Sequence, residues 1–500
     1  MEKISLSKSK YCEAVQCEKI LWLRKYRPEA AEKSGNDSVL ETGREVGEAA
    51  KGLFGDYTEI STADDIAARV ENTRSALEDK PNVIAEASFT FNGNFCSVDI
   101  LKNDADGVEI YEVKSSTEIK DIFIDDVSYQ HFILSNAGFR VKKAAIVYIN
   151  NEYVRGETLD LNQLFKIEDI TEIAEQKHSE IESKITSVTD FMQINGENME
   201  PESFLSGECF TPYECDFWSY CTKDLPKPNV FDIVRMKKTK KFEKYRQGKV
   251  SFRDLENDPD ITNAKFKEQI DFELHAREPK IELDAIKEIL DSLNYPLYFI
   301  DYETCQYAIP KYKATKPYQQ IPFQYSLHIA PEPGASLIHK EFLGDPDDEN
   351  IIRNFAESMI GNLSENGSVI VYNKGFESSV NRKIADMYPD LSDEITRINS
   401  NIVDLMVPFS KRQYYTREMK GSYSIKKVLP ALYPDDSDLD YTSLSGVHNG
   451  SEASAAFLSL KGKSPEEQSE IRKNLLKYCE LDTYAMVKIW EKFREVAGED

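Results

Sequence analysis

Acidic side chains recur at the ends of predicted elements in the C-terminal part of the chain. Asp301 and Glu303 end the apolar run NYPLYFIDYE, and the two-residue period of a strand places both carboxylates on one face. Glu377 lies near the start of a predicted helix, KGFESSVNRKIADMYP, whereas Tyr478 and Asp482 lie one turn apart on an amphipathic helix. Four such carboxylates repel one another unless divalent cations join them, and oxygen ligands suit Mg²⁺ or Mn²⁺. The pattern predicts a two-cation site for phosphodiester hydrolysis, with the Tyr478 hydroxyl positioning the attacking water.

A second group of chemically active side chains lies between residues 83 and 155. After a hairpin predicted at the Asn-Gly pair 92–93, one strand carries Asp99, and the strand VEIYEVKSS carries Glu112 and Lys114 on a single face. These three side chains can converge on one cation, with the lysine placed where a water is deprotonated. Gln130 interrupts the apolar stripe of a predicted helix, IDDVSYQHFILSNAG, and is expected to orient the lysine or the water. The alternative is an ordinary surface pair of Glu112 and Lys114, because E-x-K is a weak motif.

Cysteines form the third group. The chain has eight, and Cys209, Cys215 and Cys221 recur at six-residue intervals in CFTPYECDFWSYC. Four thiolates are needed for a tetrahedral zinc site or an iron–sulfur cluster, so a fourth ligand must come from elsewhere. Cys17 is the main candidate and Cys12 the weaker one. The sequence leaves zinc and iron–sulfur open, and three buried thiols in an aromatic-rich cap are the noncofactor alternative.

The elements that position these groups need more than one domain, because 500 residues exceed one ordinary hydrophobic core. Hydrophobic residues make up 40% of the chain and charged residues 30%, a mixture that can bury a core and excludes a disordered or disulfide-scaffold protein. Alternating strand-like and helical runs predict an α/β protein. We expect a domain over residues 1–222, a basic helical linker over 223–292 and a second domain over 293–500.

The net charge of −26 argues against a polyanionic partner unless cations are concentrated locally. Candidate phosphate contacts are the basic segment 235–249, the run KYKATK at 311–316, and Lys374, Arg382 and Lys383, with Tyr307, Tyr312 and Tyr318 as candidates for stacking on bases. A solvated helix face is the alternative for segment 235–249. Because no apolar segment has the length of a signal peptide or membrane span, we expect a cytoplasmic protein without a membrane partner; protein partners stay open.

The order of features over residues 1–222 resembles the RecB-like PD-(D/E)XK nucleases with an iron–sulfur cluster, including the Cas-four type. The matching segments are SKSKYCEAVQCEKILWL, TGREVGEAAKGLF, Asp99 with the E-x-K motif, YQHFIL and the triple-cysteine tail. The resemblance implies a restriction-endonuclease-like domain, a nuclease centre of Asp99, Glu112 and Lys114, and a [4Fe–4S] cluster on Cys17, Cys209, Cys215 and Cys221. Two features depart from the family. The last cysteines are spaced C-x5-C-x5-C rather than C-x2-C, and Gly47 stands where many relatives have a metal-binding histidine, with Glu48 as the candidate substitute ligand.

Residues 293–500 resemble the DEDDy branch of the DnaQ-like exonucleases. FIDYE, YNKGFE and YCELD match its three motifs in order; GSYSIKKVLPAL matches a segment between them, and NIVDLM adds Asp404 as a further acid. The resemblance implies a ribonuclease-H-like mixed sheet flanked by helices and a two-metal centre of Asp301, Glu303, Glu377 and Asp482, with Tyr478. Glu377 departs from the Asp that the family usually has. Proteins with this fusion are mostly described as of unknown function.

Together the two resemblances imply a metal-dependent nuclease that acts on DNA rather than RNA, with 3′ to 5′ trimming by the C-terminal centre and a second, RecB-like centre. Three alternatives stay open. The N-terminal module is a nucleic-acid-binding scaffold and only the C-terminal centre cuts; the substrate is RNA; or the chain is a noncatalytic nucleic-acid-binding adaptor, as Gly47 and Glu377 suggest.

Overall fold

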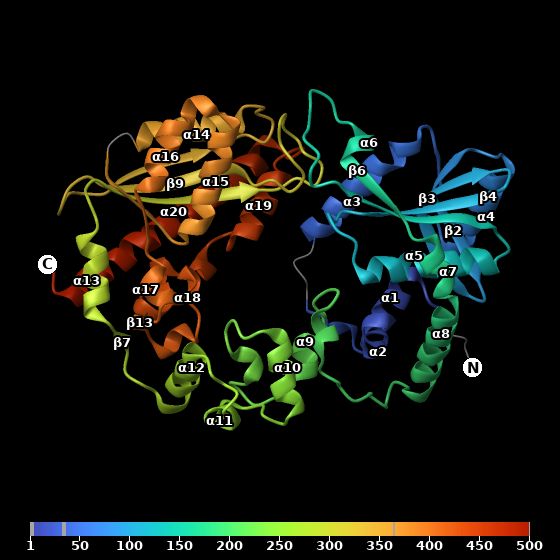
Figure 1. Ribbon diagram of the computed structural model, residues 1–500, viewed down its shortest axis with the longest axis horizontal. Helices are drawn as coiled ribbons and strands as arrows, with labels where there is room; N and C mark the ends of the chain where they lie inside the picture. Colours follow the sequence, from blue (N-terminus) through green and yellow to red (C-terminus); the bar gives the residue numbers. More distant parts are fainter. Residues whose placement is uncertain (1–4, 33–36, 364–365, 500) are drawn as a thin grey trace. The chain divides into compact units, whose positions relative to one another are not determined.

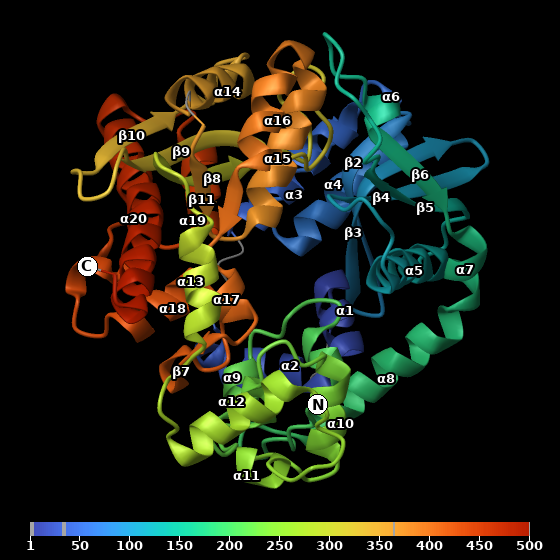
Figure 2. The same cartoon turned by 60° about the vertical axis from the view of Figure 1, so that its left-hand side comes forward.

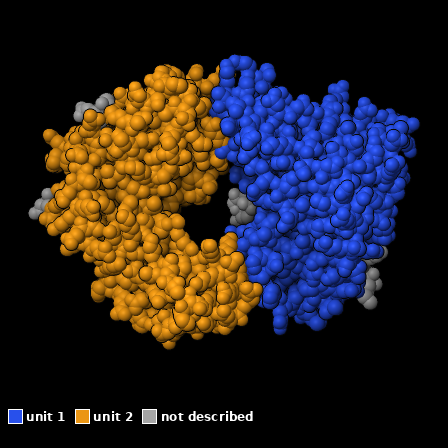
Figure 3. Space-filling model, viewed as in Figure 1, with its two compact units in different colours: residues 1–225, 307–318 blue, residues 226–306, 319–500 orange. Residues whose placement is uncertain are grey.

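The computed structural model describes residues 5–32, 37–363 and 366–499, and it is a mixed α/β structure of two compact units (Figures 1 and 3). Unit 1 comprises residues 1–225 and 307–318, and unit 2 comprises residues 226–306 and 319–500. The expected linker therefore falls almost entirely in unit 2, and a short segment of the expected C-terminal domain belongs to unit 1. No helix in the described part of the chain is long and apolar enough to cross a membrane.

Unit 1 is built on a six-stranded mixed sheet whose strands follow the order of the sequence. The first two strands pair in parallel, as do the fourth and fifth, and the other neighbours are antiparallel. The predicted hairpin is confirmed, with Asn92 and Gly93 at positive φ between its strands. The strands are β1 (Thr58–Glu59), β2 (Val83–Phe91), β3 (Asn94–Asp104), β4 (Gly107–Lys114), β5 (Val141–Ile149) and β6 (Phe165–Asp169).

Separate cores cover the two faces of this sheet. On one face, α1 (Lys8–Gln16), α4 (Ile66–Glu78), α5 (Asp121–Asn136), α7 (Thr171–Gln176) and α8 (His178–Ile194) contribute to a core with Ile110. On the other face, α3 (Asp37–Lys51), α6 (Leu161–Leu164) and the segment 307–318 contribute to a core with Tyr111. A third core joins α2 (Glu18–Tyr26) to residues near α9 (Trp218–Thr222). Glu112, next to Tyr111 in β4, therefore points to the face that α1 and α5 cover.

Unit 2 contains a five-stranded sheet in the order β10-β9-β8-β11-β12. β9 is antiparallel to both of its neighbours, whereas β11 is parallel to both β8 and β12. The strands are β8 (Leu297–Cys305), β9 (Ile321–Ala330), β10 (Ile338–Leu343), β11 (Ser368–Val371) and β12 (Ile402–Asp404). A separate pair joins β7 (Lys280–Ile281) to β13 (Tyr414–Tyr415).

Helices lie on both faces of this sheet (Figure 2). On one face, Phe355 of α14 (Ile351–Asn362) packs edge to face on Tyr302 of β8. On the other, Trp490 of the long α20 (Pro465–Ala497) lies 5.7 Å from Phe299 between ring centroids. Asp301 and Glu303 alternate with Tyr302 along β8, so strand geometry directs them to the α20 face. The other helices are α13 (Leu283–Asp291), α15 (Lys374–Met387), α16 (Ser392–Ser400), α17 (Val407–Ser410), α18 (Ile425–Leu432) and α19 (Gly450–Ser459).

The basic segment 235–249 is folded rather than extended. It contributes α10 (Lys238–Arg246), and α11 (Phe252–Leu255) and α12 (Ala264–His275) follow; residues 230–270 share a small core. Lys244 is fully buried and pairs with Asp258 at 2.8 Å and Asp260 at 2.6 Å. Lys241 donates to a backbone carbonyl. Two lysines of this segment therefore make their contacts inside unit 2.

The expected stacking tyrosines fall in the segment 307–318 of unit 1. Tyr312 is buried, and the Tyr318 hydroxyl donates to the backbone carbonyl of Ser115. These two rings serve the packing of unit 1. By contrast, Arg382 and Lys383 are exposed on α15 of unit 2.

Candidate functional site

The acids of β8 and α20 meet as the sequence predicts. One carboxylate oxygen each from Asp301, Glu303 and Asp482 lies within 4.8 Å of the others. Glu303 and Asp482 are both only 7% exposed. The strand period fixes the first two acids on one face, and the packing of α20 on that face brings the third to them. Three oxygen donors at this spacing fit a hard divalent cation such as Mg²⁺ or Mn²⁺.

Burial of like charges raises the pKa of these carboxyls. Desolvation is the largest cause in each case, and it raises the pKa of Glu303 to about 8 and that of Asp482 to about 6. The pKa of Asp301 is raised well above its usual value by burial and by the nearby carboxylates of Asp482 and Glu303. A divalent cation bound here would compete with protons for these carboxylates.

Glu377 extends the cluster from the first turn of α15. Its side chain is 2% exposed, and its Oε2 accepts no hydrogen bond from any described residue. Burial raises its pKa to about 8, and the charge of Asp404 adds to the shift. Asp404 itself accepts hydrogen bonds from the backbone N–H groups of Asn373 (3.1 Å) and Lys374 (3.0 Å), which fixes the start of α15. A buried acceptor without a donor leaves an oxygen available to an ion or a water.

Tyr478 lies beside the cluster, and two residues that the sequence did not single out complete its surroundings. Lys426 of α18 donates to the Tyr478 hydroxyl at 3.1 Å and to the carbonyl of His448 at 2.6 Å. The Tyr441 hydroxyl donates to Asp482 Oδ1 at 2.6 Å. Lys426 lies in the segment GSYSIKKVLPAL, which the resemblance marked without giving a role to any of its residues.

The residues of the predicted centre in unit 1 also lie close together, but the ammonium groups of two lysines pair with its acids. Lys114 lies 2.7 Å from Glu112 Oε1 and 2.6 Å from Asp126 Oδ2. Lys8 lies 2.7 Å from the same Glu112 oxygen. Gln130 donates to Glu112 Oε2 at 2.7 Å and to Asp126 Oδ1 at 3.0 Å, so it binds the acids that hold Lys114 rather than the lysine itself. Lys8 and Asp126 were missed by the sequence analysis.

Asp99 joins this centre through the backbone. Its Oδ2 accepts a hydrogen bond from the N–H of Val113 at 2.7 Å, and burial together with the charge of Glu112 raises its pKa to about 7. Burial alone would raise the pKa of Glu112 as well, but Lys114 and Lys8 hold it well below its usual value. Both oxygens of Glu112 thus have protein partners. The centre fits a divalent cation less well than the cluster in unit 2.

Glu48, the candidate substitute for the family's histidine, contacts other residues than these acids. Its carboxylate pairs with Lys51 at 2.7 Å and lies 3.5 Å from the Tyr57 hydroxyl, and its side chain is 66% exposed. α3 packs in the core on the opposite face of the sheet from Glu112. The structure therefore does not bring Glu48 to Asp99 and Glu112.

The four predicted cofactor thiols do come together. One small cavity is lined by Cys17, Cys209, Cys215 and Cys221. Gln16 ties the N-terminal part of this site to the cysteine loop by donating to the carbonyls of Glu208 (2.7 Å) and Tyr213 (2.8 Å). Burial, followed by the neighbouring sulfurs, raises the pKa of Cys17, Cys209 and Cys215, to about 11 for Cys215. Metal coordination offsets such a shift, because it stabilises the thiolate.

Two further observations bear on this site. Cys12 lines a different cavity, of about 240 Å³, together with Lys8 and Lys114. The structure thus favours Cys17 as the fourth ligand. Thiolates around a single zinc ion would lie about 3.8 Å apart for Zn–S bonds near 2.3 Å. Among the described residues, no three of these sulfurs lie within 4.8 Å of one another.

Comparisons with known proteins match one segment of the chain, most of which lies in unit 2. Residues 298–424 match the model of a family described as "Domain of unknown function (DUF2779)". The chain is also 33% identical over 139 residues to a protein of Ureaplasma parvum serovar 3 described as "Uncharacterized protein UU173". That match covers 24% of this chain and 20% of the relative, so the chain spans about a fifth of that protein's length. No solved structure matches the chain.

Proposed function

We propose that this chain is a metal-dependent nuclease with its reaction centre at Asp301, Glu303, Glu377 and Asp482. The observation that carries the proposal is the approach of three carboxylates, two of them buried, to within 4.8 Å, with Glu377 as a fourth acid that has an unsatisfied oxygen. When bound, Mg²⁺ or Mn²⁺ ions would stabilise the charge that develops on the attacking and leaving oxygens of a phosphodiester. A ribonuclease-H-like fold of unit 2 is part of this proposal, supported by the position of the first two acids on its central strand.

The residues around the acids have distinct tasks in this proposal. The Tyr478 hydroxyl accepts a hydrogen bond from Lys426 and donates one to the Asp482 carboxylate, which holds it beside the cation site, where it would position the attacking water. Lys426 adds a positive charge beside the phosphate. Tyr441 fixes one oxygen of Asp482, so the other oxygen is directed toward a cation. Asp404 holds the start of α15 and thereby the position of Glu377.

DNA is the proposed substrate, trimmed from its 3′ end, on the basis of the resemblance to the DEDDy exonucleases. Strand-specific end-labelled DNA and RNA, incubated with purified chain and Mn²⁺, test this. Asp301→Asn and Asp482→Asn are expected to abolish trimming, whereas Glu470→Gln, an exposed acid on the same α20, should cut like the parent. Absence of cleavage of every labelled polymer, or equal trimming by parent and Asp301→Asn, would refute the proposal. Preferential trimming of RNA would correct the substrate.

A second nuclease centre in unit 1 is the wider form of the proposal, with a restriction-endonuclease-like fold. The pairing of Lys8 and Lys114 with Glu112 favours the narrower form, in which unit 1 binds nucleic acid without cutting. Measuring cleavage in the Asp301→Asn background distinguishes these two forms of the proposal. Residual cleavage that Lys114→Ala removes would establish the second centre. Lack of residual cleavage, with salt-dependent binding of labelled DNA, would establish the scaffold.

A further inference from the structure

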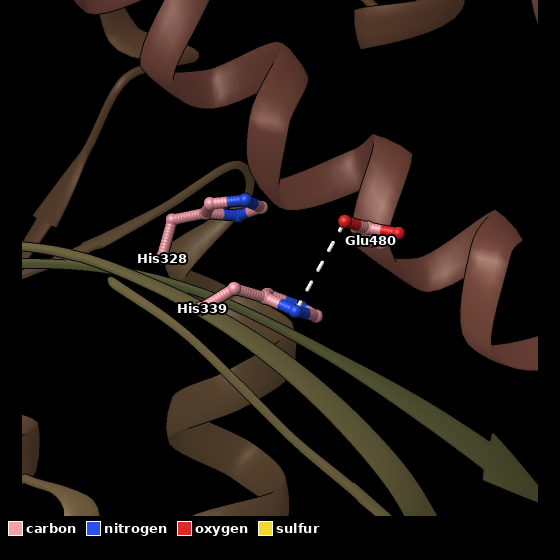
Figure 4. Close-up of side chains that lie close together, drawn as sticks. All are labelled: His328, His339 and Glu480. Carbon is pink, nitrogen blue, oxygen red and sulfur yellow. Dashed lines mark ion pairs between the residues drawn. The ribbon is translucent and has the colours of Figure 1, made fainter. Parts of the chain in front are cut away.

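Two histidines and a glutamate converge in unit 2 away from the four acids of the proposed reaction centre. One donor atom each from His328, His339 and Glu480 lies within 4.8 Å of the others (Figure 4). His328 of β9 and His339 of β10 are direct partners in the antiparallel register, with ring centroids 4.7 Å apart. Glu480 comes from α20, and its Oε1 lies 4.0 Å from His339 Nδ1. Two imidazoles and one carboxylate are a ligand set that zinc uses in proteins.

The second nitrogen of each ring is held by a hydroxyl group. Thr483 Oγ1 lies 2.8 Å from His328 Nδ1, and Ser326 Oγ lies 3.0 Å from His339 Nε2. The two hydroxyls also hydrogen-bond each other at 2.8 Å. His328 Nε2 and His339 Nδ1 are therefore the ring nitrogens left over by these bonds. Metal-binding histidines characteristically have such a partner on their other nitrogen, which fixes the ring orientation.

Burial and access also suit a metal. His328 is 6% exposed, and burial together with His339 lowers its pKa to about 4, so its ring is in the neutral form. His339 and Glu480 line a surface cavity of about 760 Å³, which gives an ion a route to the donors. Glu480 and Asp482 are two residues apart on α20, about 200° around the helix, so they face different sites.

We propose that His328, His339 and Glu480 bind a zinc ion that is separate from the proposed catalytic cations. The ion would join β9 and β10 to α20, the helix that also carries Tyr478 and Asp482. Imidazole ligands favour zinc and its late transition-metal neighbours over Mg²⁺ and Mn²⁺. The proposal does not depend on nuclease activity, because its test measures metal content and thermal stability.

The test compares the full chain with His339→Gln and Glu480→Gln after chelation and reloading with Zn²⁺. Both side chains are partly or largely accessible, so neither change opens the core. We expect each variant to hold one zinc equivalent fewer than the parent and to lose the rise in melting temperature that Zn²⁺ gives the parent. His275→Gln is the matched control, because this exposed histidine on α12 pairs only with Glu256 and Asp271 in the described residues. It should retain the parent's zinc content.

A subtler variant tests the hydroxyl partners. Thr483→Val keeps all three ligands and removes the group that holds His328, so zinc affinity should fall about 10–100-fold while the stoichiometry stays unchanged. Circular dichroism at low temperature confirms that each variant is folded. Equal zinc content in the parent, His339→Gln and Glu480→Gln would overturn the proposal. So would an equal Zn²⁺-induced rise in melting temperature in these three proteins. Zinc that remains in both ligand variants but leaves with Cys215→Ser would assign the ion to the thiols instead.

Discussion

The Lys426 ammonium lies 3.1 Å from the Tyr478 hydroxyl, and its charge acts on Asp301, Glu303 and Asp482. Its charge lowers the pKa of Asp301, Glu303 and Asp482, whereas burial raises all three. One lysine thus offsets only part of the repulsion among the four carboxylates. The remaining negative charge is what divalent cations would balance.

Replacing Lys426 by methionine should shift the cluster toward its protonated form. The carboxyl pKa values rise further when the positive charge is removed, so the pH below which protons displace Mn²⁺ from the cluster should rise by about one unit. Titration of Mn²⁺ binding at several pH values measures this. The acid limb of the binding curve should move to higher pH, and Lys427→Met, the adjacent residue, is the control. An unchanged limb would contradict the role given to Lys426.

The stability of unit 2 without divalent ions should fall as pH rises from about 5 to about 8. Glu303 and Glu377 have a pKa of about 8 in the folded chain against 4.5 as the ordinary value. Between these values the folded state holds protons that the unfolded state has lost, so the free energy of unfolding decreases with pH. Mn²⁺ should reverse the loss, because it binds the deprotonated form.

Glu303→Gln tests this linkage by calorimetry in the presence of a chelator. The amide cannot ionise, so the variant should show a shallower decrease of melting temperature with pH. Near pH 8 its melting temperature should exceed the parent's by about 2–4 °C for each kcal/mol gained. Glu470→Gln should follow the parent. Identical pH dependence in Glu303→Gln and the parent would show that Glu303 titrates normally.

Loss of Lys8 should destabilise unit 1 while opening its acidic centre to cations. Lys8→Met leaves the buried Glu112 with Lys114 as its remaining ammonium partner, and we expect a cost of about 1–3 kcal/mol in the free energy of unfolding. Mn²⁺ binding to unit 1, measured in the Asp301→Asn background, should tighten. Lys10→Met, an exposed lysine on the same helix, should alter neither quantity. Weaker Mn²⁺ binding after loss of Lys8 would mean that the lysine does not compete with a cation.

Cys215 and Cys12 line different cavities, so replacing each by serine should affect the iron and sulfide content differently. Cys215→Ser removes one of four converging thiols, so if these hold the iron–sulfur cluster that the resemblance implies, the parent purified anaerobically should be brown and this variant should lack the colour, the iron and the sulfide. Cys12→Ser should keep all three, because Cys12 lies in the cavity of Lys8 and Lys114. Iron and sulfide analysis of the two variants decides the ligand set. A colourless parent with one zinc ion would identify zinc at this site.

Local periodicity was sufficient to predict which acids face one another. The two-residue period placed Asp301 with Glu303 and Glu112 with Lys114, and helical spacing placed Tyr478 with Asp482. The hairpin at 92–93 follows equally from backbone preferences of Asn and Gly. These features depend on residues close together in the chain.

Contacts between distant segments were not predictable in the same way. Lys8 reaches Glu112 across 104 positions, and Lys426 reaches Tyr478 across 52. Neither lysine belongs to a periodic pattern that distinguishes it from a solvent-exposed charge. In the basic segment 235–249, a lysine expected at the surface is buried instead. Nothing near Lys244 in sequence reveals its burial against Asp258. Packing of whole elements, which a single sequence does not encode locally, decides these pairs.

Residues 307–318 follow the strand of Asp301 and Glu303 directly, yet they complete a core of unit 1, in which Ala308 is buried. A fragment ending at residue 225 would therefore leave apolar side chains of that core uncovered in water, and it is expected to aggregate when expressed by itself. Fusing the twelve-residue segment 307–318 to the end of this fragment should restore a monodisperse protein. The sequence of unit 1 is thus discontinuous, with its last twelve residues inserted in the sequence of unit 2.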